Sequence, residues 1–122
     1  MLEWEQTLDF LGWCVMSGAI TTDDVRKWAD MMLLDGDDHV ELLAELSMYN
    51  GHPAKIFHNK IIDELMTNQW FKCESETDAL YGIACKRGFD PCEMSCEKAS
   101  MHLEKHPHVE QIFREVFPFI EF

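Results

Sequence analysis

Apolar side chains recur along most of this chain at intervals of three and four residues, which is the spacing of one face of an α-helix. In the first segment the pattern is carried by Trp4, Leu8, Leu11 and Val15. No segment alternates convincingly between apolar and polar residues, as a half-buried β-strand does. The sequence therefore predicts an all-α fold.

Residues that begin and end helices divide the chain into short segments. Gly18 follows the first apolar stripe, and Thr21 offers an N-capping hydroxyl to the second. Asp38 and Glu41 have the spacing of a capping box for a third helix. Further helix starts are expected at Pro53, Ser75, Asp90-Pro91 and Pro107, and helix ends at Asp35-Gly36, Asn50-Gly51 and Gly88.

These signals predict six or seven short antiparallel helices in one compact domain that covers residues 1–122. The apolar tail, residues 117–122, is expected to dock on the core. The stretch 68–74 is ambiguous between the end of a helix and a loop. Successive helical hairpins stacked as a short solenoid are the alternative arrangement, although no repeat of fixed period supports it.

The charge of the chain is strongly negative, with 23 acidic and 10 basic residues and a formal net charge of −13. Residues 21–50 contribute −6 of this, because eight acids face only Arg26 and Lys27. A field of one sign on a small domain attracts a basic macromolecule and repels nucleic acid and anionic membranes. Hydrophobic residues still make up 47% of the chain, so the charge does not indicate disorder. The sequence favours a basic protein as partner, and neither nucleic acid nor a membrane.

The compartment is also suggested by the sequence. Residues 1–5 are acidic, unlike an export signal, and no apolar run approaches the roughly 18 residues of a membrane span. We therefore expect a cytoplasmic location, in which the five cysteines are reduced thiols.

An ordinary helix face mixes charges of both signs, so a run of acids with few bases indicates a binding surface. The alternative is that these acids only cap helices and solvate one helix face. An exposed aromatic residue beside them would anchor an interface, and Trp70 is the candidate, with core packing as its alternative. The predicted partner-binding residues are Asp35, Asp37, Asp38, Glu41, Glu45 and Trp70.

A cluster of cysteines and histidines in the C-terminal part raises the possibility of a zinc site. Cys92 and Cys96 are four residues apart, so one helix face would present both to a metal ion. They also share a stripe with Ala99 and Leu103, where free cysteines pack as small apolar residues. We favour core cysteines and expect no metal and no cofactor. The residues weighed are Cys85, Cys92, Cys96, His102, His106 and His108.

No catalytic motif is found. The chain lacks a glycine-rich phosphate loop, a nucleophile elbow and a dinucleotide fingerprint. Its acidic field favours the neutral form of a cysteine over the thiolate that a nucleophile requires. We therefore name no catalytic residue and expect a binding protein rather than an enzyme.

A short segment resembles a known family. Residues 17–30 read Ser-Gly-Ala-Ile-Thr-Thr-Asp-Asp-Val-Arg-Lys-Trp-Ala-Asp, and Glu45-Leu46-Ser47 follows. This pattern resembles small bacterial immunity proteins of contact-dependent growth inhibition and other polymorphic toxin systems, over roughly residues 10–50. The resemblance implies a cytoplasmic protein that binds and blocks one toxin domain, which is often a nuclease with a basic substrate-binding face.

Together these expectations describe an immunity protein that occludes the basic face of a toxin nuclease, as a monomer in a one-to-one complex. Two alternatives stay open on the sequence alone. One is an acidic mimic of nucleic acid that inhibits a host or phage protein, and the other is a small zinc-containing enzyme.

Overall fold

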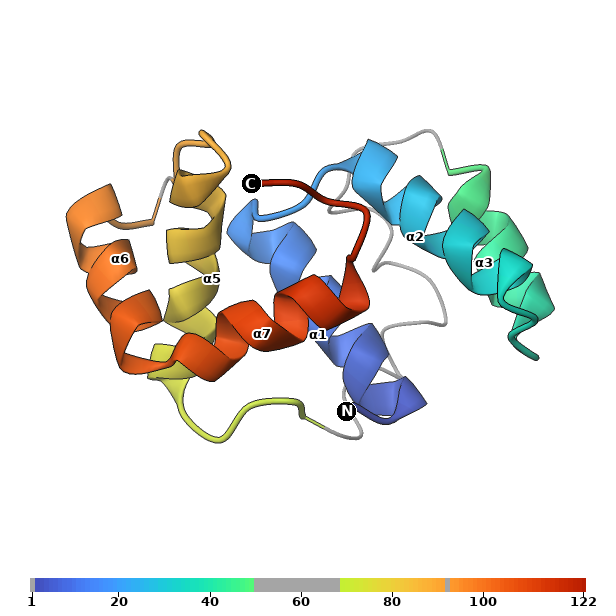
Figure 1. Ribbon diagram of the computed structural model, residues 1–122, viewed down its shortest axis with the longest axis horizontal. Coiled ribbons are helices and arrows are strands. Elements are labelled where there is room, and N and C mark those ends of the chain that lie inside the picture. Colours follow the sequence, from blue (N-terminus) through green and yellow to red (C-terminus); the bar gives the residue numbers. More distant parts are fainter. Residues whose placement is uncertain (1, 50–68, 92) are drawn as a thin grey trace.

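Two helical hairpins flank a central pair of helices (Figure 1). Helices α5 (Glu74–Lys86) and α6 (Cys96–Lys105) pack together on one side, and α2 (Thr22–Leu34) and α3 (Val40–Ser47) pack together on the other. Between the hairpins lie α1 (Trp4–Ser17) and α7 (Pro107–Val116).

The computed structural model describes residues 2–49, 69–91 and 93–122. Six helices and no strand occur in these ranges, so the predicted all-α fold is confirmed. The helix expected from Pro53 lies outside the described residues. None of the described helices combines the length and the apolar character that crossing a membrane requires.

The first two helices begin and end where their capping residues predict. Gly18 ends α1 with a φ of 78°, a left-handed conformation that glycine adopts without the steric cost of a Cβ atom. At the start of α2, Thr21 Oγ1 accepts a hydrogen bond from Asp24 N at 3.2 Å, and Asp24 Oδ2 accepts one from Thr21 N at 2.8 Å. This reciprocal capping box fixes the first turn of α2.

Aromatic side chains from α1, α7 and the C-terminal tail meet in the core. Phe10, Phe113 and Phe117 are fully buried. The ring centroid of Phe10 lies 6.4 Å from that of Phe113 and 6.2 Å from that of Phe117. Ile120 is buried as well, so the predicted docking of the tail is confirmed. Contacts between aromatic rings at these distances stabilise the core beyond the area that they bury.

Helices α5 and α6 approach each other closely at Gly82. A Cβ atom added there would lie 2.7 Å from the carbonyl oxygen of Ala99 and 2.9 Å from Leu103 Cβ. A disulfide between Cys85 and Cys96 joins the same two helices, and the Cα atoms of these two cysteines are 5.8 Å apart. The expectation of reduced thiols is wrong for this pair, because the hairpin places the last turn of α5 against the first residue of α6.

The predicted start of α3 differs from the structure. His39 is the N-cap residue rather than Asp38, and its side chain forms no capping hydrogen bond. The turn is held by Asp37, whose Oδ1 accepts a hydrogen bond from His39 N at 2.8 Å. The capping box expected from Asp38 and Glu41 is therefore wrong, because the neighbouring aspartate makes the local bond instead. The helix ends at Ser47, with Met48 as its C-cap.

The start of α6 also differs. The helix expected from Asp90-Pro91 begins only at Cys96, because Ser95 Oγ accepts a hydrogen bond from Lys98 N at 3.3 Å and caps it there. Cys96 is thus an exposed first residue of the helix and not a core residue of an apolar stripe. The later stripe residues Ala99 and Leu103 are buried as expected, while Cys92 lies outside the described residues.

Candidate partner-binding surface

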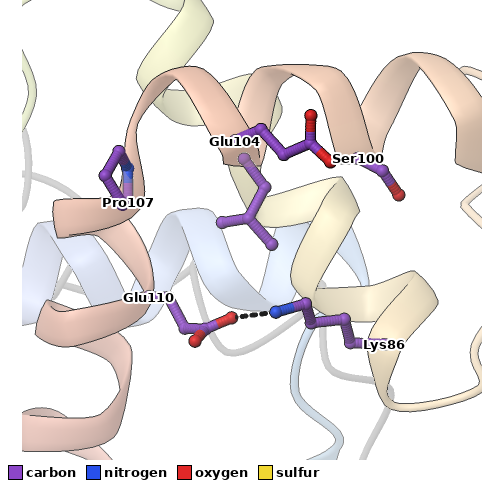
Figure 2. A pocket seen from close by; sticks show the side chains of 6 residues that line it. Lys86, Ser100, Glu104, Pro107 and Glu110 are labelled. Carbon is purple, nitrogen blue, oxygen red and sulfur yellow. Dashed lines mark hydrogen bonds and ion pairs between the residues drawn. The ribbon is translucent and has the colours of Figure 1, made fainter.

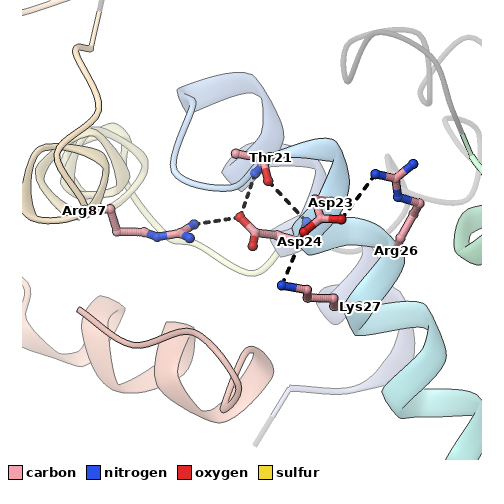
Figure 3. A network of polar contacts seen from close by, with 6 residues as sticks. All are labelled: Thr21, Asp23, Asp24, Arg26, Lys27 and Arg87. Atoms are coloured by element: carbon pink, nitrogen blue, oxygen red, sulfur yellow. Dashed lines mark hydrogen bonds and ion pairs between the residues drawn. The ribbon is translucent and has the colours of Figure 1, made fainter.

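Ion pairs anchor the start of α2 to neighbouring elements (Figure 3). Arg87, the residue that follows α5, donates a hydrogen bond from Nη1 to Asp24 Oδ2 at 2.8 Å. Asp23 pairs instead with Arg26 at 3.2 Å and with Lys27 at 3.3 Å on its own helix. The acids at the N-terminal end of α2 are therefore neutralised within the chain.

A hollow of about 380 Å³ lies beside the C-terminal half of α2, between that helix, the start of α1 and the end of α7. Its apolar lining includes the rings of Trp4 and Trp28. Three carboxylates also line it, those of Asp35, Asp37 and Glu115, and none of its described lining residues is Lys or Arg. The other lining residues are Leu2, Thr7, Met31, Met32, Ile112, Val116 and Pro118.

A stack of three rings, two of them from lining residues, lies at this hollow. Trp4 stacks on Trp28, with ring centroids 6.2 Å apart, and on His39, with centroids 3.7 Å apart and ring planes within 6°. His39 Nδ1 in turn lies 2.7 Å from Asp37 Oδ1. The stack links α1, α2 and the entry to α3, and it sets the position of the Asp37 carboxylate.

The Asp37 carboxyl, which lines this hollow, is more acidic than usual. Burial raises the pKa of Asp37, but hydrogen bonds from the backbone and ring of His39 outweigh burial and hold the pKa of this carboxyl below its usual range. Asp35 and Glu115 are exposed. Within the described residues, neither forms an ion pair with a Lys or Arg side chain. Their charge is therefore available to a partner.

A second hollow, of about 350 Å³, adjoins the first, because Met31 and Asp35 line both. Leu34 lies in its lining and is 88% exposed. We call the two hollows together the α2–α7 surface. Exposed apolar side chains within a charged rim are the usual composition of a protein-binding patch. The other residues that line the second hollow are Lys27, Asp30 and Phe119.

The predicted binding acids separate into two groups. Asp35 and Asp37 line the α2–α7 surface. Asp38, Glu41 and Glu45 are exposed along α3 and its entry, and they line neither hollow. The first group stands beside an apolar lining, whereas the second lies on an exposed helix face and its entry.

Trp70 is buried, so its predicted role as an exposed anchor is wrong. It is only 7% exposed, and its ring packs edge-on against Phe10 with centroids 4.8 Å apart. Its backbone N–H donates a hydrogen bond to Asp9 Oδ2 at 3.1 Å. This bond and the ring contact hold the non-helical segment 69–73 against α1, which settles the ambiguous stretch for the described residues.

Several residues of the α2–α7 surface were not predicted, namely Trp4, Met31, Ile112 and Glu115. Trp4 and Ile112 belong to apolar helix stripes that the sequence assigns to the core, Met31 lies outside the stripe of its helix, and the structure leaves all three only partly buried. Glu115 is an acid outside the acidic segment. The placement of α7 and the end of α2 along one hollow depends on the tertiary structure, which no local pattern encodes. A weak signal was present in the richness of apolar residues around the Asp35-Gly36 turn.

Two histidines of the C-terminal part are hydrogen-bonded to neighbouring side chains. His108 Nε2 lies 2.7 Å from Glu76 Oε2, and His102 Nδ1 lies 2.8 Å from Ser75 Oγ. In the described part of the chain, no group of three or more His, Cys, Asp or Glu side chains is placed to hold a metal ion. The pairing of Cys85 with Cys96 also engages two of the sulfur ligands that a zinc site here would need.

A third hollow, of about 330 Å³, lies between α5, α6 and α7 (Figure 2). Lys86 and Glu110 form an ion pair across it. The hydrogen bond from Lys86 lowers the pKa of Glu110, although burial partly offsets this effect. Because its lysine and one of its two glutamates neutralise each other, this hollow offers a partner less charge than the α2–α7 surface does.

The lining of the α2–α7 surface combines apolar and acidic side chains. The described part of this lining consists mainly of carboxylates, thioethers, indoles and aliphatic side chains, and holds no pairing of a nucleophile with a base. No protein-family model, curated protein sequence or solved structure matches the chain. A function must therefore be inferred from the residues of the chain itself.

Proposed function

We propose that this chain is a binding protein of the immunity type, which neutralises a basic toxin domain by covering its active-site face. The toxin is a nuclease domain, and the complex contains one copy of each chain in the cytoplasm of the producing cell. The observation that carries this proposal is the juxtaposition of Asp35, Asp37 and Glu115 with an apolar hollow.

The charge of the chain suits such a partner. A nuclease binds the phosphates of its substrate with basic side chains, and carboxylates of an inhibitor pair with the same side chains. A net charge of −13 speeds the encounter of the two proteins through long-range attraction. Asp38, Glu41 and Glu45 contribute to this steering from the exposed face of the α2–α3 hairpin.

Apolar contacts would then hold the complex together. Affinity in protein interfaces is concentrated in a few well-packed side chains, which are surrounded by a polar rim. Leu34, at 88% exposed, and the partly buried Met31 provide such contacts at the centre of the α2–α7 surface. The acidic residues around them form the rim.

A cytoplasmic site of action sets a condition on the Cys85–Cys96 disulfide. A reducing compartment keeps thiols free. The domain must therefore fold and bind its partner with these two cysteines reduced. The buried cluster that joins the helices supports this requirement, because it includes residues of every described helix and not only those of the α5–α6 hairpin.

The test is an inhibition assay with the toxin domain encoded beside this chain. Equimolar wild-type protein should abolish cleavage of RNA or DNA. Leu34→Ser should weaken this protection, whereas Met101→Ser, a matched change at an exposed methionine of α6, should not. If no toxin domain is inhibited, or if the protein itself binds nucleic acid with submicromolar affinity, the proposed function is wrong.

A further inference from the structure

The 380 Å³ hollow of the α2–α7 surface has a lining of apolar and acidic side chains that suits one particular kind of side chain. Its carboxylates come from two separate elements, because Asp35 and Asp37 follow α2 whereas Glu115 lies on α7. The rest of the lining is mainly apolar and includes the partly buried Trp4 and Trp28, whose exposed fraction is only 1%. A ligand that fills the hollow must therefore cover apolar surface along its length and carry positive charge.

We infer that this hollow takes the side chain of an arginine from the partner protein, with its aliphatic stem against the apolar lining and its guanidinium among the three carboxylates. The inference rests on the proposed function and names the part of a basic partner that the hollow recognises. Arginine is weakly hydrated, stacks on aromatic rings and forms paired hydrogen bonds with carboxylates. Lysine offers a compact ammonium that is more strongly hydrated and lacks the planar fork.

The charge balance of the lining supports this occupant. Three carboxylates and no Lys or Arg are found among the described lining residues. Three described cations pair with acids outside the hollow, since Arg26 and Lys27 pair with Asp23, and Arg114 pairs with Glu110. A guanidinium supplied from outside would therefore meet Asp35 and Glu115, which have no described Lys or Arg partner, and Asp37, which is paired with His39.

The test uses short helical peptides that carry one central arginine, or in its place lysine, uncharged citrulline or glutamate. Binding is followed by NMR through the indole N–H signals of the ¹⁵N-labelled protein. Trp4 and Trp28 line the hollow and should shift on titration with the arginine peptide. Trp13, which packs on Phe71, and the buried Trp70 lie outside its lining and serve as internal controls.

Two double variants separate local recognition from general attraction. Asp35→Asn/Glu115→Gln removes two charges from the hollow, and Glu97→Gln/Glu104→Gln removes the same charge from the exposed side of α6. We expect the first variant to bind the arginine peptide about tenfold more weakly, because charged hydrogen bonds are lost, and the second to bind nearly as wild type does. Circular dichroism measures whether each variant is folded. Titration of the wild-type protein with the arginine, lysine, citrulline and glutamate peptides is a test that needs no variant.

The inference is supported if Trp4 and Trp28 shift with the arginine peptide, shift less with lysine, and stay unchanged with citrulline and glutamate. It is overturned if the two double variants lose affinity equally, or if the shifts do not depend on arginine. A toxin domain that binds without moving these two signals would overturn the inference and leave the proposed function intact. If the shifts depend on arginine but no toxin domain is inhibited, the inference about the hollow is supported and the proposed function is wrong.

Discussion

Arg87 and Asp24 form an ion pair between the end of α5 and the first turn of α2, with Nη1 and Oδ2 2.8 Å apart. Only 14% of the arginine side chain and 9% of the aspartate side chain are exposed. The same nitrogen donates a hydrogen bond to the carbonyl oxygen of Ala19. Because Asp24 also accepts a hydrogen bond from Thr21 N, one carboxylate both caps α2 and holds it to α5.

Removal of Arg87 should therefore destabilise the whole domain. Arg87→Met leaves the Asp24 carboxylate shielded from water without its charged partner, at a cost of about 3 kcal/mol in the free energy of unfolding. Lys27→Met, which breaks an exposed pair with Asp23 on α2, should cost less than about 1 kcal/mol. Urea unfolding followed by circular dichroism measures both, and equal losses would show that the Arg87–Asp24 pair has no special role.

The contact between Gly82 and Ala99 gives a second prediction. In Gly82→Ala the new methyl group would lie 2.7 Å from the Ala99 carbonyl oxygen, which is too close without a shift of α5 against α6. Overpacking of this kind costs about 1–3 kcal/mol, even though alanine favours the helix more than glycine does. Ser100→Ala on α6 is the control and should change stability little. A more stable Gly82→Ala protein would mean that the hairpin is looser than described.

Glu76 should give the fold part of its pH dependence. Burial raises its pKa, but hydrogen bonds from His108 and from the backbone N–H of Lys72 outweigh burial and lower the pKa below its usual 4.5. A carboxyl whose pKa is lower in the folded state stabilises the fold above its unfolded pKa, and this stabilisation is lost as pH falls through the folded value.

Glu76→Gln should therefore be less stable than wild type near neutral pH, and the two proteins should converge as the pH falls below about 4.5. Unfolding by urea at a series of pH values measures this difference. Glu104→Gln, which removes an exposed carboxylate of α6, is the control. A difference between Glu76→Gln and wild type that stays constant across the series would contradict the assigned coupling.

The disulfide should stabilise the fold without being required for it. Closing a loop between residues 11 positions apart stabilises a protein by about 2–3 kcal/mol through the unfolded state. Cys85→Ala/Cys96→Ala should therefore unfold at lower urea concentration but keep its helical spectrum. Cys73→Ser, at an exposed free cysteine, should match wild type. Loss of all helical structure in the double variant would exclude a reduced, cytoplasmic form.

The sequence predicts the fold well wherever a local interaction determines the element. The end of α1 follows from Gly18 and the start of α2 follows from Thr21, because a left-handed glycine and a capping threonine act through bonds within a few residues. The prediction fails at α3, where Asp37 and Asp38 are adjacent and both are able to hold the turn. Local chemistry does not decide between them; the structure pairs Asp37 with His39, whose ring is held on Trp4 from α1.

The candidate site is less accessible to prediction from sequence. Asp35 and Asp37 are identified by the excess of acids, which is a property of composition. Glu115 and Trp4 are not, because their positions beside α2 depend on how α1 and α7 cross the core. Trp70 shows the reverse case, since polar neighbours in the sequence suggest exposure whereas the fold buries the ring against Phe10.

Amide hydrogen exchange of the free protein and of its complex with the toxin domain tests most directly whether the α2–α7 surface is the binding face. We expect new protection in peptides that cover residues 30–37 and 112–119, and little change in α5 and α6. Protection confined to the α5–α6 hairpin, or to α3 without residues 30–37, would contradict the proposed surface and place the partner elsewhere on the molecule.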